Sequence, residues 1–248
     1  MNDPNTHVLE VWGDLACFTR PEMKVERFSY PVITPSAARG IFDAIYWEGI
    51  RDKKGMKPYF YWQIRKIEVL EPPRYIALRR NEVKEKISAQ AVKKWINGEE
   101  VQPIVADWGK EELGTDQKGR TQRQTMALKN VRYRIHASIV PKAEFSGQIA
   151  KYNNMFHRRA ARGQCYWQPY LGCREFPAYF KLAEDEAVAA FPLDQPLGWM
   201  LYDVFDLRRE RVEDSQPFIS LFDATVKNGV LEVPDFNDPA VRKPEGGA

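Results

Sequence analysis

Hydrophobic and polar positions alternate along several short segments of this chain, which is the pattern of β-strands that bury one face. Segments 7–18 (HVLEVWGDLACF) and 59–72 (YFYWQIRKIEVLEP) show it, and the second ends at a pair of prolines. The clearest alternation lies in 126–140, and a further strand is predicted in 170–183 (YLGCREFPAYFKLA). In 126–140 one predicted face carries Val131, Tyr133, Ile135, Ala137 and Ile139, and the other carries Arg132, Arg134, His136 and Ser138.

Two segments have the spacing of amphipathic helices instead. In 35–50 (PSAARGIFDAIYWEGI) Pro35 marks the entry, and apolar residues recur every three or four positions. Segment 143–162 (AEFSGQIAKYNNMFHRRAAR) predicts a second helix, closed by Gly163. The order strand, helix, strand, strand, helix, strand predicts an α+β fold with a ferredoxin-like (βαββαβ) domain, in which two helices cover one face of a four-stranded sheet. The open face and the helix ends would be free for a ligand.

Two further regions lie outside this pattern. Segment 73–125 is polar and charged, and we expect a long insertion there with one short helix near 88–98. Past residue 185 more strands are predicted, and Asn228-Gly229 is a strong hairpin signal. These strands lie near 198–207, 217–222 and 229–234. We therefore expect residues 1–185 to form the ferredoxin-like domain, and residues 186–248 to form a small antiparallel β-sheet domain with an unstructured tail.

The composition fits a globular protein of the cytoplasm. The chain has 248 residues, 44% of them hydrophobic, and a mean hydropathy of -0.53. No run approaches the roughly 20 apolar residues of a membrane helix, and the first residues lack the features of a signal peptide. The three cysteines form no CxxC pair, which favours reduced thiols. We expect no membrane association.

The net charge of +3 hides an uneven distribution. Segment 120–174 contains eleven Lys or Arg residues and a single acid, Glu144, whereas segment 183–248 contains fourteen acids and six bases. Aromatic residues are interleaved with the basic ones near 166–170. A basic stripe of this kind is what a polyanion such as a nucleic acid requires. A solvated basic face without a partner is the competing interpretation.

Motifs for nucleotide cofactors, serine hydrolysis and zinc proteolysis are absent from the sequence. The three histidines and three cysteines are scattered, and we expect neither a metal nor a cofactor. Asp203 and Asp206 suggest a metal-dependent nuclease at first sight. Residues three apart in a strand point to opposite faces, however, so this pair is a poor chelate.

A metal-free reaction on RNA needs few groups, because RNA carries its own nucleophile, the 2'-hydroxyl. A protein can position that hydroxyl, take its proton and stabilise the phosphorane, and each placed proton-transfer group contributes roughly 10²–10⁴-fold. Tyr, Lys and His are residue types suited to these roles. Tyr46, Lys151 and His157 lie near the ends of the two predicted helices and are the catalytic candidates.

Three segments together resemble the Cas5d family of type I-C CRISPR systems. They are 11–47 (VWGDLACFTRPEMKVERFSYPVITPSAARGIFDAIYW), 120–137 (RTQRQTMALKNVRYRIHA) and 170–180 (YLGCREFPAYF). The resemblance extends over nearly the whole chain. It implies a metal-independent endoribonuclease that cuts precursor CRISPR RNA at its repeat hairpins. It also implies a ferredoxin-like domain, a small β-rich C-terminal domain, and later residence with other CRISPR-associated subunits in a surveillance complex guided by the CRISPR RNA.

The resemblance also bears on single residues. Tyr46 in GIFDAIYW matches the position of the family's catalytic tyrosine. The family's adjacent Lys and His are not both present, since Tyr152 follows Lys151 and the histidine comes only at His157. Six residues on a helix turn about 240°, so Lys151 and His157 cannot share one face of a regular helix.

The remaining basic and aromatic residues are predicted RNA contacts. Arginines would hold phosphates without reading sequence, Trp167 with Tyr166 and Tyr170 would stack on an unpaired base, and Gly172 would allow close approach of the backbone to RNA or to the helix ends. The predicted RNA-binding set is Arg120, Arg123, Arg132, Arg134, His136, Arg158, Arg159, Arg162, Trp167, Gly172 and Arg174.

Two other functions stay open on the sequence. The chain could be a non-catalytic subunit that binds CRISPR RNA, which the missing Lys-His pair favours. It could also bind double-stranded DNA or act as a metal-dependent DNase, for which the same basic stripe would serve.

Overall fold

The computed structural model describes residues 5–23, 25–101, 103, 119–183, 188–214 and 216–244. The chain divides into two compact units, each described by itself below. The larger unit comprises Met1–Ile76 together with Met126–Ala248, and the smaller comprises Ala77–Thr125.

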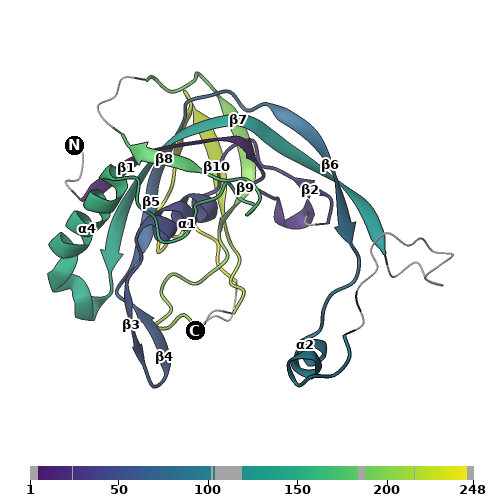
Figure 1. Ribbon diagram of the computed structural model, residues 1–248. Coiled ribbons are helices and arrows are strands. Elements are labelled where there is room, and N and C mark those ends of the chain that lie inside the picture. Colours follow the sequence, from purple (N-terminus) through teal and green to yellow (C-terminus); the bar gives the residue numbers. More distant parts are fainter. Residues whose placement is uncertain are drawn as a thin grey trace. The chain divides into compact units, whose positions relative to one another are not determined.

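An antiparallel sheet forms the centre of the larger unit (Figure 1). Four of its strands are adjacent in the order β8-β1-β7-β5, and each neighbouring pair is antiparallel. Their bounds are β1 Thr6–Ala16, β5 Phe60–Val69, β7 Arg120–Pro141 and β8 Tyr179–Leu182. The four strands predicted at 7–18, 59–72, 126–140 and 170–183 are therefore all present, although β8 occupies only the end of its segment.

The C-terminal strands continue the same sheet beyond β5. They are β9 (Gln195–Asp203), β10 (Ser220–Lys227) and β11 (Val230–Glu232), and β11 pairs with β5. The Asn228-Gly229 turn between β10 and β11 has positive φ at both residues, as the predicted hairpin requires. These strands were expected to form a sheet of their own, but β5 offers a free edge that β11 occupies. The division at residue 185 stays a prediction.

Helix α1 (Pro35–Ile45) begins where the Thr34 side chain accepts a hydrogen bond from the backbone N–H of Ala37. It ends five residues earlier than predicted, because Tyr46 is already extended with φ -151° and ψ 118°. An unpredicted hairpin follows at once, formed by β3 (Gly49–Asp52) and β4 (Gly55–Pro58). The early end of α1 determines where the next side chains point.

Helix α4 (Ile149–Ala161) follows a 3₁₀ turn at Ala143–Gln148. It buries Tyr152, Phe156 and Ala160, which are four residues apart and share one face. Phe156 stacks on Phe42 of α1 at 5.4 Å between ring centroids and lies 4.5 Å from the ring of Trp62 in β5. Both helices therefore pack on the same face of the sheet.

The opposite face of β7 is not open at its centre. Arg134 and Ser138 are 7% and 3% exposed. The Arg134 guanidinium donates to the backbone oxygen of Val188 at 2.9 Å, and the backbone N–H of Phe191 donates to Val69 in β5. The chain segment that leads into β9 thus covers part of the face that was expected to be free for a ligand.

The smaller unit contains most of β6 (Tyr75–Val83), the helix α2 (Ala89–Ile96) and the first residues of β7. The short helix predicted near 88–98 is present, with Ser88 as its N-cap. Strand β6 was not predicted, because none of its residues is buried and charged residues obscure its alternation. Residues 104–118 of the predicted insertion lie outside the described residues. No helix in the described parts of the chain is long and apolar enough to cross a membrane.

Candidate functional site

Tyr46, Glu48 and Lys151 form one hydrogen-bonded group, called here the Tyr46–Glu48–Lys151 cluster. The Tyr46 hydroxyl donates to Oε2 of Glu48 at 2.5 Å, and Nζ of Lys151 donates to Oε1 of the same carboxylate at 3.0 Å. The structure thus brings together two of the three predicted catalytic residues, and it does so through a carboxylate that was not predicted.

The fold fixes Tyr46 from several sides. It directly follows α1, its backbone N–H donates to Phe42, and its carbonyl accepts from the indole of Trp62 at 2.9 Å. Its ring packs against Phe60, with centroids 5.4 Å apart, and the residue is only 4% exposed. The hydroxyl is therefore the one part of this side chain with a polar partner, and that partner is Glu48.

Glu48 and Lys151 lie nearer the surface. The side chain of Glu48 is 32% exposed and that of Lys151 is 49% exposed. The backbone oxygen of Glu48 accepts from the N–H of Tyr59 at 3.0 Å, which holds the residue beside the hairpin. Lys151 stands in the first turn of α4, one residue before the buried Tyr152 that anchors the helix. A ligand would meet the carboxylate and the ammonium first.

The three groups have defined protonation states near neutral pH. Burial and the nearby Glu48 raise the pKa of Tyr46, so its phenol is neutral. Burial acts to raise the pKa of Glu48, but the hydrogen bonds from Tyr46 and Lys151 outweigh it, and the pKa is lowered. The hydrogen bond with Glu48 raises the pKa of Lys151. The cluster is a neutral phenol, a carboxylate and an ammonium.

Helix α4 extends the positive charge away from this cluster. Lys151, Arg158 and the C-cap residue Arg162 are seven and four residues apart, which places them within a sector of roughly 40° around the helix axis. These three residues are named the α4 basic face. Arg158 and Arg162 are exposed, and neither is ion-paired within the described part of the chain. Their positions are compatible with the phosphate contacts predicted for them.

Arg159 points toward the cluster rather than toward solvent. Its guanidinium donates to the carbonyl of Ile45 at 3.2 Å and lies 5.9 Å from the centroid of the Tyr46 ring. It also lowers the pKa of Glu48, although the hydrogen bonds from Tyr46 and Lys151 contribute more. Arg159 therefore links α4 to the end of α1.

His157 lies apart from this group. It is exposed and lines a cavity of about 690 Å³ with His7 and Lys181. The cavity shares no residue with the Tyr46–Glu48–Lys151 cluster. The separation follows from the turn of about 240° between Lys151 and His157. The structure therefore does not support His157 as a third member of the group.

The basic side chains on the sheet that were predicted to contact RNA are paired with carboxylates of the chain itself. Arg132 donates to Glu10 at 2.7 Å, Arg134 donates to Glu68 at 2.7 Å, and His136 lies 2.9 Å from the other oxygen of Glu68. Glu10 and Glu68 are 6% and 8% exposed, and a buried carboxylate requires a paired charge. These positions do not support direct phosphate contacts, because the structural pairing already satisfies the side chains.

The other predicted basic contacts lie in two places. Arg120 and Arg123 belong to the smaller unit, in which Arg123 pairs with Glu82 at 3.3 Å. Arg174 is exposed, in the loop before β8.

Aromatic residues 166–170 do lie near the end of α1. The backbone N–H groups of Tyr166 and Trp167 both donate to the carbonyl of Ala44, at 2.8 and 3.3 Å. The two rings meet edge to face at 5.2 Å and are 73% and 69% exposed. Exposed rings anchored two residues before Tyr46 are consistent with the predicted stacking on a base.

Gly172 has a structural role within the chain. Its φ is +82°, and an added Cβ would lie 2.1 Å from the carbonyl oxygen of Cys17. The close approach predicted for this glycine is therefore made to the end of β1. None of the three cysteines forms a disulfide.

The acidic pair near the end of β9 is engaged elsewhere. Asp203 accepts from Arg39 at 2.6 and 3.0 Å, and Asp206 pairs with Arg208 at 2.9 Å. Within the described residues no three His, Cys, Asp or Glu side chains form a group that could hold a metal ion.

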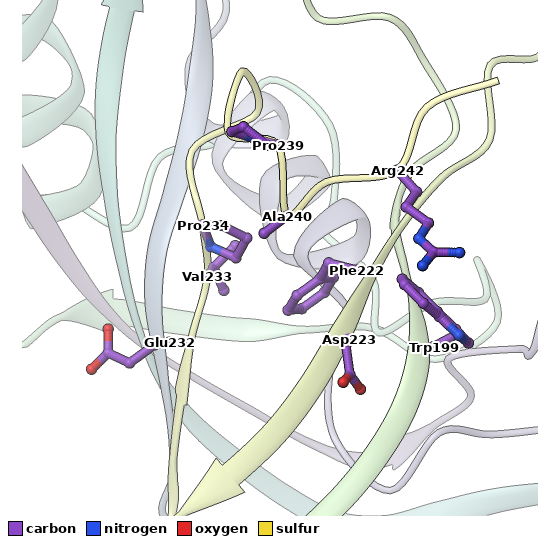
Figure 2. A pocket seen from close by; sticks show the side chains of 9 residues that line it. All are labelled: Trp199, Phe222, Asp223, Glu232, Val233, Pro234, Pro239, Ala240 and Arg242. Carbon is purple, nitrogen blue, oxygen red and sulfur yellow. The ribbon is translucent and has the colours of Figure 1, made fainter. Parts of the chain in front are cut away.

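A second cavity, of about 540 Å³, lies on β10, β11 and the chain that follows them. Figure 2 shows Arg242 beside the ring of Trp199 on one side of it and Glu232 on the other. The Arg242 guanidinium lies 4.2 Å from the Trp199 centroid. This cavity shares no residue with the cluster.

Glu48 is the site residue that sequence reasoning missed. The first helix was predicted to continue to residue 50. In a helix, residues two apart such as Tyr46 and Glu48 point to different sides. In an extended chain, residues two apart share a side, so ending α1 at Ile45 would have placed Tyr46 and Glu48 together.

The chain matches known proteins over nearly its full length. A family model described as CRISPR-associated protein (Cas_Cas5), the Cas5d model, matches residues 6–234. The CRISPR pre-crRNA endoribonuclease Cas5d of Mannheimia succiniciproducens is 42% identical over 243 residues, which cover 95% of this chain and 97% of the relative. The protein of the same name from Thermus thermophilus is 37% identical over 238 residues, covering 91% and 90%.

Two solved structures have a similar fold. A CRISPR-associated protein superposes with a TM-score of 0.60 at 18% identity and covers 96% of both chains. A functionally uncharacterized protein from Streptococcus mutans has a TM-score of 0.58 at 17% identity, again with 96% of both chains covered.

Proposed function

The chain belongs to the Cas5d family of CRISPR-associated proteins, and from this premise we propose that it is an endoribonuclease that cleaves precursor CRISPR RNA at its repeat hairpins. The observation that carries the proposal is the Tyr46–Glu48–Lys151 cluster at the start of the α4 basic face. The two relatives named as pre-crRNA endoribonucleases support it further, since the match covers 97% and 90% of their lengths.

We propose that the reaction is a transesterification within the RNA that needs no metal. The 2'-oxygen bonds to the adjacent phosphorus, the bond from phosphorus to the 5'-oxygen breaks, and the products are a 2',3'-cyclic phosphate and a 5'-hydroxyl. The Lys151 ammonium stabilises the charge on the phosphorane and protonates the leaving 5'-oxygen. The cluster also contains the group that accepts the proton of the 2'-hydroxyl.

The α4 basic face and the exposed aromatic pair give this site a means of holding RNA. Arg158 and Arg162 contact phosphates, and Trp167 stacks on an unpaired base beside the hairpin. Their exposure and their attachment to the helix ends near Tyr46 support this arrangement. Double-stranded DNA is a competing polyanion for the same face.

We further propose that the core is ferredoxin-like and that residues 186–248 are appended to residues 1–185. The strand order β8-β1-β7-β5, with α1 between β1 and β5 and α4 between β7 and β8, supports the first part. After cleavage the chain would stay with the CRISPR RNA, alongside other subunits of a type I-C surveillance complex in the cytoplasm. Its three cysteines, which form no disulfide, suit a reducing compartment.

The test is cleavage of labelled repeat RNA by the purified protein in EDTA. We expect cleavage, a 5' fragment that ends in a 2',3'-cyclic phosphate, and complete loss of cleavage when a 2'-deoxy nucleotide replaces the one at the cut. The deoxy substrate should bind as well as the RNA. A 3'-hydroxyl product, or a strict requirement for Mg²⁺, would contradict the mechanism.

A second candidate function is RNA binding without cleavage. It is favoured by two observations: Tyr152, and not a histidine, follows Lys151, and His157 lines another cavity. Tight binding of the repeat RNA with no cleavage at any pH would establish it. Activity only on DNA with added metal would instead indicate a DNase.

A further inference from the structure

We propose that Glu48 is the general base of the cleavage and that Tyr46 orients it. This inference rests on the proposed function and assigns the proton acceptor that the function leaves open. The hydrophobic periodicity of the sequence does not point to Glu48, because its place beside Tyr46 depends on where α1 ends.

Tyr46 is poorly suited to accept a proton. Its hydroxyl already donates its proton to Glu48 at 2.5 Å, and the residue is 4% exposed. Burial and the carboxylate raise its pKa, which keeps the phenol protonated at neutral pH. A buried neutral phenol that donates to a carboxylate acts as a hydrogen-bond donor. The 2'-hydroxyl proton must therefore go to another atom.

Glu48 has the properties that Tyr46 lacks. Its carboxylate is partly exposed and lies between the phenol and the ammonium. A carboxylate has about four lone-pair sites, and Tyr46 and Lys151 use one each, so acceptor capacity remains for a substrate hydroxyl. Lys151 is protonated and cannot compete for the proton, and His157 lines a different cavity. Glu48 is thus the one acceptor side chain in the cluster.

The proton balance closes within the cluster. The 2'-hydroxyl gives its proton to Glu48 while the bond between the 2'-oxygen and phosphorus forms. Lys151 gives a proton to the 5'-oxygen as the bond between phosphorus and that oxygen breaks. Glu48 is then protonated and Lys151 is neutral. The 3.0 Å hydrogen bond between them lets the proton return to Lys151, which restores the starting state without an outside reactant.

The first experiment measures single-turnover cleavage of the repeat RNA in EDTA for the wild type, Glu48→Gln and Tyr46→Phe. Gln keeps the size of the side chain but cannot take the proton, so we expect a loss of about 10²-fold or more. Tyr46→Phe removes one orienting hydrogen bond, so we expect a smaller loss of about tenfold. RNA affinity should not fall in Glu48→Gln, because the variant removes a negative charge.

The pH dependence separates a base from a merely structural residue. With Glu48 as base, the acidic limb of the wild-type rate follows the pKa of that carboxylate, which the hydrogen bonds from Tyr46 and Lys151 lower. Tyr46→Phe removes a hydrogen bond that lowers this pKa, so its rate should begin to fall at a higher pH. Glu48→Gln should lose this acidic limb altogether. A role that does not depend on the ionisation of Glu48 would change the rate equally at every pH.

Each outcome decides the question. Full activity of Glu48→Gln would overturn the assignment, and increased activity would show that Glu48 restrains Lys151. Equal losses of rate in Glu48→Gln and Tyr46→Phe, with an unshifted acidic limb, would assign the role of base to Tyr46.

If Glu48→Gln melts at a much lower temperature than the wild type, Glu48→Asp replaces it. Asp keeps a carboxylate and should retain the limb, and a loss as large as that of Gln would overturn the proposal. Failure of the wild type to cleave would instead refute the proposed function.

Discussion

Lys151 and His157 illustrate how much depends on the side of a helix that a residue occupies. Both are exposed on α4, yet Lys151 contacts Glu48 and His157 lines a separate cavity. The proposed reaction uses the ammonium of Lys151 twice, on the phosphorane and on the leaving oxygen. It uses no imidazole.

We therefore expect Lys151→Ala to slow single-turnover cleavage by about 10²-fold, the size expected for the loss of one acid or charge stabiliser. His157→Ala is the matched control, since it removes an exposed polar side chain from the same helix, and its rate should stay within about threefold of the wild type. Gel electrophoresis of labelled RNA measures both. Loss of activity in His157→Ala alone would place the chemistry in the cavity with His7.

At the residue scale, the sequence predicted which kinds of side chain form the site better than it predicted which of them contact one another. Tyr46 and Lys151 could be identified because each lies near a predicted helix end. Glu48 could not, because its position depends on where α1 stops. Arg134 was wrongly expected on an open face, because nothing in the alternation of β7 shows that Glu68 of β5 and the backbone of Val188 lie against it.

At the scale of elements, α4 combines two roles on two faces. One face buries Tyr152, Phe156 and Ala160 against the sheet, and the other presents the α4 basic face. Periodicity alone predicted this helix and the four central strands. It missed β6 and the hairpin of β3 and β4, in which Pro58 is the only buried residue and no clear apolar alternation is present. It also could not show that β11 pairs with β5, because strand pairing between distant segments leaves no local pattern.

The α4 basic face predicts how RNA binding depends on salt. If Arg158 and Arg162 each neutralise one phosphate, binding releases condensed counterions, and each contact contributes about -0.7 to -0.9 to the slope of log K against log salt. The double variant Arg158→Ala, Arg162→Ala should flatten the slope by about 1.5 and weaken all RNA sequences similarly. Fluorescence anisotropy at several salt concentrations measures it.

Arg132→Ala provides the matched control for this measurement. It removes the same side chain, but Arg132 is already paired with the buried Glu10. Its substitution should therefore leave the salt slope unchanged. An unchanged slope in the α4 double variant would mean that Arg158 and Arg162 face a protein partner instead of RNA.

At the scale of the whole molecule, the two compact units differ in how they are built into the chain. The larger unit depends on contacts between its N-terminal and C-terminal parts. β11 pairs with β5, and Asp203 of β9 holds the buried guanidinium of Arg39 in α1. The smaller unit, Ala77–Thr125, enters and leaves through the antiparallel neighbours β6 and β7.

This difference predicts opposite results for two deletions. Removal of residues 186–248 should prevent cooperative folding, because it exposes the edge of β5 that pairs with β11 and removes Asp203, which accepts two hydrogen bonds from Arg39. Replacement of residues 77–125 by a short Asn-Gly turn should leave the larger unit folded, since two antiparallel strands can be joined by a two-residue hairpin. Circular dichroism during thermal unfolding would show a single transition in the second variant and none in the first.

A folded 1–185 fragment would show that the C-terminal strands are an independent addition to the sheet. An unfolded 77–125 deletion would show that the smaller unit is required for the larger one to form.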